Sequence, residues 1–397
     1  MRARSRAALA AGAAGAAVAA GLAIARPVLD SLVAREEARL NRVLLGPAVP
    51  VSDRARALHA TLRVADLHAD SLLFGRDLVE RGNRGHADIP RWIEGGVALQ
   101  VLSMAVKTPR GLNIDRNADT SDDVLTLALA KRWPAATWRR NLPRVEHLAS
   151  SARRFEARSG GRFRVLETRA DLAAYLDVRG RDAGITAAIL SIEGAHALDD
   201  DPANVETAAD LGIRMISPAH FFDTAFGGSA HGMEQGGLTA AGRDMVQRME
   251  SRGVILDLAH ASARTIDDAL TVSTRPVVAS HTGVRGIADN ARNLSDVHLA
   301  GIAATGGLVG IGFWDTACGG SDAAAIARSV VYGVERVGAD HVALGSDWDG
   351  AVPVPFDAAN VVRLTDALLD AGLNDAAIRL VMGENVLRLL AEALPPA

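Results

Sequence analysis

The run Val64-Ala-Asp-Leu67, followed directly by His68-Ala-Asp70, sets the pattern for the whole chain. It is a short apolar segment of strand length that ends in a histidine and a carboxylate. Seven more apolar runs follow, at residues 97–102, 186–192, 213–216, 254–258, 276–279, 308–313 and 341–344. Amphipathic stretches lie between most of them, including residues 238–251, 263–269, 323–337 and 361–371. Eight alternations of strand and helix predict an α/β fold, a closed (β/α)8 TIM barrel with parallel strands.

The predicted barrel occupies residues 61–394, and residues 28–60 form an amphipathic connector in front of it. One connection within the barrel, residues 109–183, is too long for a single crossover between two strands. We therefore expect extra helices between the second and third predicted strands, at residues 121–133, 145–158 and 170–176.

Residues 1–27 differ in composition from the rest of the chain. Arg2, Arg4 and Arg6 precede an uncharged run from residue 7 to residue 25, which is typical of an export signal. Ala23-Ile-Ala25 would serve as a cleavage site for such a leader. The run is also nearly long enough to remain as a membrane anchor. Both interpretations predict an exported protein, periplasmic or on the outer face of the membrane; a soluble alanine-rich helix fits the flanking arginines poorly.

Composition limits the chemistry that this protein can perform. A net charge of −4 and a pI near 6.3 argue against nucleic-acid binding. The single cysteine, Cys318, excludes an intrachain disulfide and a thiolate metal cage, whereas 11 histidines and 47 carboxylates are available. Any metal ion must therefore be held by nitrogen and oxygen ligands.

Side chains that suit metal binding stand at or just after the carboxyl ends of six of the eight apolar runs. They are His68, Asp70, Glu193, His220, His260, His281 and Asp347. The carboxyl ends of parallel barrel strands converge on one face, where enzymes of this fold build their active sites. We therefore expect these side chains to lie together.

The spacing of these residues suggests how they would share metal ions. His68 and Asp70 are two residues apart on an extended segment, so both side chains point the same way. His260 and His281 are separated by one strand–helix unit, so neighbouring strands would bring them together. Three histidines with two or three carboxylates suit zinc or another borderline divalent ion, and two ions could share one carboxylate.

The remaining candidates have more ordinary interpretations. Asp349 precedes Gly350 and is expected to make a turn, whereas Asp347 is closer to its strand end. His196 and His231 are expected to lie around the site or in loops. Surface or structural roles are expected for His59, His86, His147, His298 and His341.

Seven motifs resemble, in order, those of the membrane dipeptidases (renal dipeptidases), peptidase family M19 of the metal-dependent amidohydrolase superfamily. They are residues 66–70, 192–196, 214–220, 257–262, 280–283, 292–296 and 345–350. The resemblance extends from Val64 to Leu390. We expect neither the C-terminal lipid anchor nor the disulfides of the mammalian members, a pattern that is more similar to the bacterial branch.

The resemblance implies a centre of two Zn²⁺ ions. His68 and Asp70 would bind one ion, His260 and His281 the other, and Glu193 would bridge both. Some superfamily members use a carboxylated lysine as the bridge, but both lysines of this chain precede residue 132.

The resemblance also implies the reaction, which is hydrolysis of dipeptides by a metal-activated hydroxide. His220 would contact the substrate carbonyl, and Arg292 would bind the substrate carboxylate. Asp347 would act as the acid and base. The family resemblance further implies tolerance of a C-terminal D-residue.

Two alternatives stay open at this point. An N-acyl-amino-acid amidohydrolase could use the same centre, because its substrates also end in a carboxylate. A catalytically silent barrel that binds peptides or metal is disfavoured, because Asp347 and His220 are both present. We expect a dipeptide or small amide as the substrate, and the sequence leaves a homodimer and N-terminal membrane attachment open.

Overall fold

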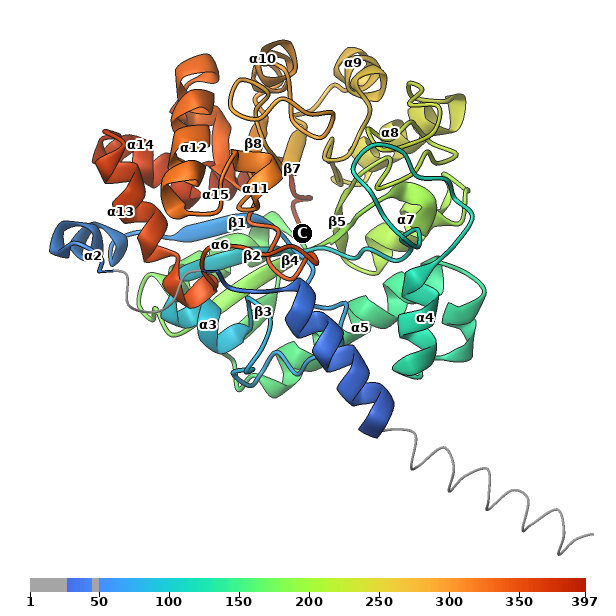
Figure 1. The fold of residues 1–397 in the computed structure, drawn as a ribbon, viewed down its shortest axis with the longest axis horizontal. Coiled ribbons are helices and arrows are strands. Elements are labelled where there is room, and N and C mark those ends of the chain that lie inside the picture. Colours follow the sequence, from blue (N-terminus) through green and yellow to red (C-terminus); the bar gives the residue numbers. More distant parts are fainter. Residues whose placement is uncertain (1–26, 45–49) are drawn as a thin grey trace, which may run out of the picture.

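The computed structural model describes residues 27–44 and 50–397, and its strands form one parallel sheet (Figure 1). Within these residues the strands are β1 (Val64–Ala69), β2 (Val97–Leu102), β3 (Phe163–Val165), β4 (Thr186–Ile192), β5 (Ile213–Ile216), β6 (Ile255–Leu256), β7 (Val278–Thr282), β8 (Leu308–Ile311) and β9 (Val342–Leu344). Their order is β6-β5-β4-β2-β1-β9-β8-β7, with β3 beside β4.

The two ends of this order meet, so the sheet closes. Asp257, just past β6, forms a parallel bridge with Val278 at the start of β7. The Leu258 amide also donates to the Val278 carbonyl, at 2.6 Å. Eight strands thus form a closed ring, and each contains part of one of the eight predicted runs. The prediction of a (β/α)8 barrel is confirmed.

One strand, β3, was not predicted. It pairs with Thr186–Ala188 in the first half of β4, whereas β5 pairs with residues 190–192 in the second half. β4 is long enough to have different neighbours along the same edge. β3 therefore adds a short strand outside the ring without changing the barrel.

Helices surround the strands, as Figure 1 shows. The α-helices after the N-terminal helix (residues 27–40) are α2 (Asp53–His59), α3 (Ile89–Glu94), α4 (Asp123–Ala130), α5 (Leu142–Arg158), α6 (Arg169–Arg179), α7 (Asn204–Asp210), α8 (Ala240–Ser251), α9 (Ala263–Val272), α10 (Asp296–Ala304), α11 (Asp315–Cys318), α12 (Ala323–Val337), α13 (Val362–Asp370), α14 (Asp375–Arg379) and α15 (Asn385–Ala393). Shorter turns are η1 (Ala135–Trp138), η2 (Ala195–Leu198), η3 (Ala339–His341), η4 (Ala358–Asn360) and η5 (Leu380–Glu384). The helices expected between the second and third predicted strands are present as α4, α5 and α6.

Both faces of the barrel strands are buried, as expected for a parallel sheet covered by helices. Along β1, Ala65 and Leu67 belong to one apolar cluster, whereas Val64 and Ala69 belong to another. This double burial explains why the strands appear in the sequence as nearly continuous apolar runs.

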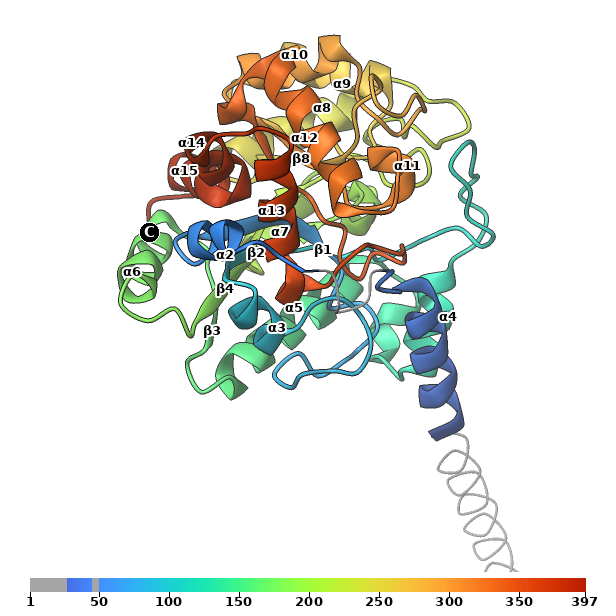
Figure 2. The same cartoon turned by 60° about the vertical axis from the view of Figure 1, so that its left-hand side comes forward.

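The two ends of the barrel differ in character. The C-terminus lies beside α6, where the Arg169 amide donates to the Pro395 carbonyl at 2.8 Å (Figure 2). The long loops that follow the strands gather at the other end, together with the N-terminal helix. No helix within the described ranges is long and apolar enough to cross a membrane. The predicted export segment falls on residues outside those ranges, apart from Pro27.

The N-terminal helix is fixed to the barrel by a buried carboxylate. Glu37 is fully buried and pairs with Arg76 and Arg84, each at 2.5 Å from its guanidinium Nε. Arg76 also contacts Asp349, which follows β9. Just beyond the helix, Asn41 accepts a hydrogen bond from the Ala351 amide at 2.8 Å. The segment predicted as a connector thus makes specific contacts with the loop after β9.

We expect the Glu37→Ala variant to lose stability because it leaves Arg76, which is also buried, without one of its two carboxylate partners. Removing one partner of a buried ion pair costs about 3 kcal/mol. Glu36→Ala is the matched control, because Glu36 is exposed and pairs with Arg39 on the same helix. Urea denaturation would measure both variants, and hydrogen exchange would follow the amides of residues 27–40. Equal behaviour of the two variants would show that Glu37 does not anchor the helix.

Candidate metal centre and active site

Glu193 lies at the middle of the predicted site, directly after β4. Its Oε1 atom is 3.1 Å from His260 Nε2, 3.3 Å from His281 Nε2 and 3.6 Å from His68 Nε2. Its Oε2 atom is 3.4 Å from His220 Nε2. One carboxylate thus touches four imidazoles that come from four different strand ends.

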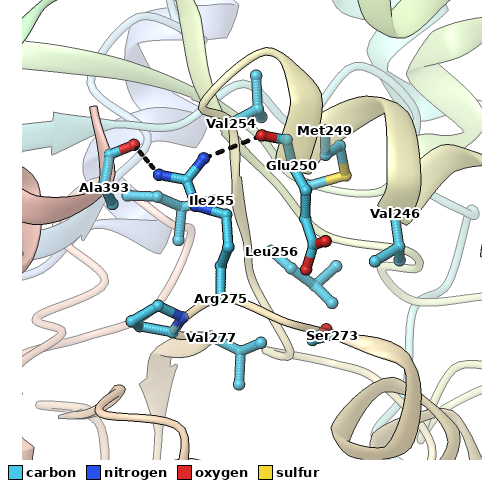
Figure 3. A pocket seen from close by; sticks show the side chains of 11 residues that line it. Val246, Met249, Glu250, Val254, Ile255, Leu256, Ser273, Arg275, Val277 and Ala393 are labelled. Atoms are coloured by element: carbon cyan, nitrogen blue, oxygen red, sulfur yellow. Dashed lines mark hydrogen bonds between the residues drawn. The ribbon is translucent and has the colours of Figure 1, made fainter. Parts of the chain in front are cut away.

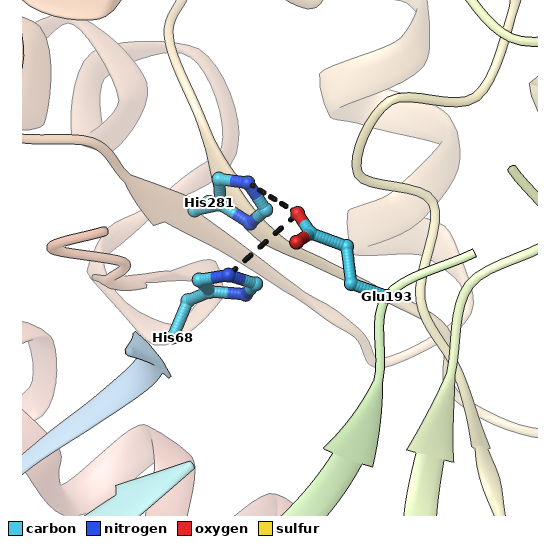
Figure 4. A group of neighbouring side chains, drawn as sticks. All are labelled: His68, Glu193 and His281. Atoms are coloured by element: carbon cyan, nitrogen blue, oxygen red, sulfur yellow. Dashed lines mark ion pairs between the residues drawn. The ribbon is translucent and has the colours of Figure 1, made fainter. Parts of the chain in front are cut away.

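Figure 4 shows how β1, β4 and β7 bring three of these residues together, with Glu193 reaching toward His68 and His281. Asp70 completes the β1 side, because its Oδ2 atom is 3.5 Å from His68 Nε2. Asp347, three residues past β9, places Oδ1 at 4.0 Å from the same nitrogen. All the residues proposed from the sequence as metal ligands therefore lie within one buried cluster.

Burial and like charge shift the acidities of this cluster. Burial raises the pKa of Glu193 well above its usual value, and the neighbouring Asp70 carboxylate adds to the effect. Burial likewise raises the pKa of Asp347 to about 8, although His68 acts in the opposite direction. Burial disfavours a charged His68, but Glu193, Asp70 and Asp347 outweigh this and raise its pKa to about 10.

The remaining imidazoles behave differently. Burial lowers the pKa of His220, His260 and His281 well below the usual value, with help from neighbouring positive groups. These rings are therefore neutral at pH 7 and keep a nitrogen lone pair, which is the form that binds metal.

The donor set fits divalent metal ions on two observations. His68 Nε2 and Asp70 Oδ1 are buried and have no hydrogen-bond partner, although buried polar atoms normally have one. Three carboxylates crowd the same buried space, and a cation would relieve their repulsion. Residues of the cluster also form three sets of donor atoms with mutual distances within 4.8 Å: His68, Glu193 and His281; Glu193, His220 and His260; and His68, Asp70 and Asp347.

Ser280 and Asp257 orient two of the imidazoles from behind. Ser280 Oγ donates to Asp257 Oδ2 at 2.6 Å and lies 2.9 Å from His281 Nδ1 and 3.3 Å from His68 Nδ1. Because its one proton is directed to Asp257, the hydroxyl oxygen accepts from both Nδ1–H groups. This arrangement leaves Nε2 of the neutral His281 without a proton and facing Glu193, as a metal ligand requires. His68 Nε2 faces Glu193 in the same way, and it would become a ligand when a cation replaces its proton.

Asp66 supports the loop after β9. It is fully buried, and it accepts from the Ser346 amide at 2.8 Å and from Gln100 Nε2 at 2.7 Å. Ser346 immediately precedes Asp347, so Asp66 connects β1 and β2 to the position of the proposed acid and base.

Arg292 lies in the loop after β7 and is buried beside the cluster. Burial lowers its pKa to about 10, so it remains charged at neutral pH. Its guanidinium lies 5.6 Å from the Trp314 ring and donates to the His281 carbonyl. Within the described ranges no carboxylate is in ion-pair contact with it, so a substrate carboxylate can occupy that position.

Some site residues adopt strained backbone conformations. His260, Asp347 and Asp349 have φ values of 62°, 60° and 65°, a left-handed region that residues other than glycine rarely occupy. Such positions cluster where a site requires a particular side-chain direction.

The site opens into a cavity of about 910 Å³ at the carboxyl ends of the strands. Seven of the eight predicted site residues line it, all except His68. A smaller cavity of about 10 Å³ adjoins β6 and β7, where Arg275 connects the carbonyls of Glu250 and Ala393 (Figure 3). It has room for about one water molecule. The larger cavity is therefore the candidate active site.

The other histidines are divided between the site and the body of the protein. His231 lines the larger cavity, and its Nδ1 atom lies 2.5 Å from the Ile114 carbonyl. His196 is buried against Phe222. His86 is fully buried, where its Nδ1 accepts from the Asp349 amide. His59, His147, His298 and His341 are absent from the lining of the large cavity.

Four residues to which the sequence pattern gave no role also support the site: Ser280, Asp257, Asp66 and Glu37. The first three stand inside or beside motifs quoted above, so their position next to a ligand was an available signal. Glu37 offered no such signal, because it stands among charged residues typical of an exposed helix.

A parallel (β/α)8 barrel that gathers four histidines and three carboxylates at its strand ends defines a metal-dependent hydrolase. The chain belongs to the membrane dipeptidase family, peptidase family M19, whose sequence model matches residues 52–394. It is therefore a metallo-dipeptidase.

Individual relatives agree with this assignment. Dipeptidase tcpJ from Claviceps purpurea is 28% identical over 317 residues, which cover 78% of this chain and 69% of that protein. The solved structure of dipeptidase AC, a metallo peptidase of family M19, is 27% identical with a TM-score of 0.67, covering 84% of this chain and 99% of that chain. A metallo peptidase from Rhodobacter sphaeroides, solved with a phosphinate mimic of the dipeptide L-Ala-D-Ala, is 26% identical with a TM-score of 0.66 and the same coverage.

We expect the Ser280→Ala variant to bind metal about 10- to 100-fold more weakly, because His68 and His281 lose the acceptor that fixes their tautomers. Competition with a coloured zinc chelator would measure the affinity. Ser329→Ala is the matched control, since Ser329 is a buried serine on α12 outside the cavity lining. Unchanged zinc affinity in a folded Ser280→Ala protein would remove this role.

Proposed function

We propose that this protein hydrolyses dipeptides at a centre of two zinc ions bridged by Glu193, and that it accepts a D-residue at the C-terminal position. The observation that supports the bridge most is the contact of one Glu193 oxygen with His68, His260 and His281, at 3.1–3.6 Å. Acceptance of a D-residue is supported by the mimic of L-Ala-D-Ala bound to the Rhodobacter sphaeroides relative.

The ligands divide into two sets around Glu193. His68 and Asp70 would hold one ion, and His260 and His281 the other. When bound, the ions would supply Lewis acidity, which makes water more acidic and polarises a carbonyl oxygen.

The remaining residues position the substrate and move the proton. Arg292 binds the terminal carboxylate through its planar guanidinium, which fits a dipeptide and excludes an internal peptide bond. His220 is neutral and buried, and with Nε2 protonated it donates a hydrogen bond to the carbonyl oxygen as negative charge develops there.

Asp347 acts as the acid and base. Its Oδ1 atom faces the cluster, where a carboxylate can accept and release a proton. It takes the proton of the attacking water and delivers it to the departing amine. The alternative of a silent barrel offers no reason for a buried, strained acid at this position.

An N-acyl-amino-acid amidohydrolase remains the second candidate, because Arg292 serves any substrate that ends in a carboxylate. We expect the purified protein to hydrolyse L-Ala-D-Ala, to lose this activity in a chelator and to regain it with added zinc. A panel of L,L- and L,D-dipeptides and N-acyl amino acids, assayed by release of free amino acid, separates the two candidates. Activity that persists after complete metal removal would contradict the proposed centre.

Two substitutions distinguish the proposed role of Asp347 as acid and base from that of Glu193 as metal bridge. Asp347→Asn should keep both ions but lower kcat by about a hundredfold or more, because the amide cannot carry the proton. Glu193→Gln should lose metal together with activity. Elemental analysis and steady-state kinetics on the same preparations would test both. Full activity of the first variant, or two ions retained by the second, would contradict the assigned roles.

We also propose that the protein acts outside the cytoplasm, with the leader either cleaved near Ala25 or kept as an anchor. The support is the sequence alone, in which three arginines precede an uncharged run. Cell fractionation with mass spectrometry of the mature N-terminus would test this proposal. Full-length protein recovered only from the cytoplasm would overturn it.

A further inference from the structure

We propose that the active site selects substrates with a bulky apolar group on the carbonyl side of the scissile amide, and that the N-terminal helix supplies one wall of the pocket for that group. This inference rests on the proposed function, because it names the substrate class of the same site. The shared chemistry is an apolar group, which either a large first side chain of a dipeptide or an acyl chain on an amino acid would provide.

The N-terminal helix presents an apolar stripe to the cavity. Leu29, Leu32, Val33 and Leu40 line it, and their spacing of three, four and seven residues places them on one helical face. Across the cavity, apolar side chains come from the region after β2 and from α4: Leu112, Ile114, Val124 and Leu127. Lys131, at the end of α4, lies 3.2 Å from Asp30 on the helix, so the two walls are connected.

This apolar region lies across the barrel from the carboxylate site. Arg292 follows β7, whereas Leu112 and Ile114 follow β2. In the closed strand order, three strands separate β7 from β2 on each side. A substrate with its carboxylate at Arg292 and its amide at Glu193 therefore extends its other end toward the apolar walls.

The size of the cavity fits a substrate larger than two alanines. About 910 Å³ is near the upper end of the roughly 300–1,000 Å³ of pockets that hold drug-sized ligands. The space beyond the metal ligands would remain filled with water around L-Ala-D-Ala. An apolar group that displaces this water gains the free energy of burying its surface.

Two of the carboxylates in these walls are already paired. Glu36 contacts Arg39 at 2.6 Å, and Asp123 contacts Arg110 at 3.2 Å. They offer little to an added ammonium group, whereas an apolar group needs no partner. The walls therefore favour an uncharged group beyond the scissile amide.

The helix is held in place by contacts that do not depend on substrate. The buried Glu37, one turn after Val33 on the same helix, pairs with Arg76 and Arg84. A wall fixed in this way costs no ordering entropy when substrate binds. The apolar pocket is therefore preformed.

The test compares kcat/KM for L-Ala-D-Ala, L-Phe-D-Ala and N-decanoyl-D-Ala. We expect at least one bulky substrate to exceed L-Ala-D-Ala by about tenfold or more. Comparison of L-Phe-D-Ala with N-decanoyl-D-Ala shows whether a large side chain or an acyl chain is preferred. A preference for L-Ala-D-Ala over both would overturn the inference while leaving the proposed function intact. If none is hydrolysed, the proposed function fails, and calorimetric binding of the same compounds to the zinc-loaded Asp347→Asn protein still tests the pocket.

Charged substitutions in the two apolar walls test whether these walls cause the preference for a bulky apolar substrate. Leu32→Arg and Leu112→Arg should each reduce the ratio of kcat/KM for the preferred bulky substrate to that for L-Ala-D-Ala by about tenfold. Both side chains are partly exposed, at 53% and 40%, so the variants should fold. Val28→Arg and Leu129→Arg are the matched controls, on the same helix and on α4 but outside the cavity lining. An unchanged ratio in both test variants would overturn the inference.

A membrane surface is the competing occupant of this apolar face. Sedimentation with phosphatidylglycerol vesicles would detect it. If Leu32→Arg and Val28→Arg lose vesicle binding equally and the substrate ratio stays constant, the face contacts lipid and the inference is wrong. Loss of the substrate ratio in Leu32→Arg alone supports the pocket.

Discussion

The site depends on the repulsion among three carboxylates that the barrel buries together. Asp70, Glu193 and Asp347 all contact or approach His68, and each is nearly inaccessible to water. Charges at such short distances interact strongly when water is excluded. Burial, together with the neighbouring carboxylates, raises the pKa of Glu193 and of Asp347, although His68 and Arg292 act in the opposite direction. The protein balances this excess only by taking up protons or by binding cations.

The barrel can hold such a cluster because its strands are fixed by packing that has nothing to do with the site. Strands buried on both faces are held in place by close packing. The strained residues, His260 and Asp347, stand just beyond those ends, where the surrounding structure determines their conformation. Ser280 belongs to β7 itself, so the hydrogen bonds that orient two imidazoles come from the rigid part of the fold.

The barrel could be predicted from the sequence because burial on both faces leaves an uninterrupted apolar run, and eight such runs are present. β3 could not be predicted from an apolar run, because it has three residues and its middle one, Arg164, is exposed. The grouping of the site residues could also be predicted, since strand ends converge in this fold. The spacing predicted the pairs, whereas the proposed assignment of those pairs to two ions, with Glu193 between them, rests on the family resemblance. Glu37 could not be found, because its burial depends on Arg76 and Arg84, which are distant in the sequence and lie in a loop.

The same ion pairs connect the outer wall of the cavity to the reacting groups. Glu37 holds the N-terminal helix by its ion pair with Arg76, and Arg76 also pairs with Asp349. The Ser71 hydroxyl donates a further hydrogen bond to Asp349, at 2.5 Å. Asp349 stands two residues after Asp347 in a turn where both have left-handed backbone conformations. Any movement of the helix that separates Glu37 from Arg76 would therefore unbalance the charge on Asp349. The wall of the pocket and the loop of the acid and base thus share one anchor, so the geometry of substrate binding and that of proton transfer are set together.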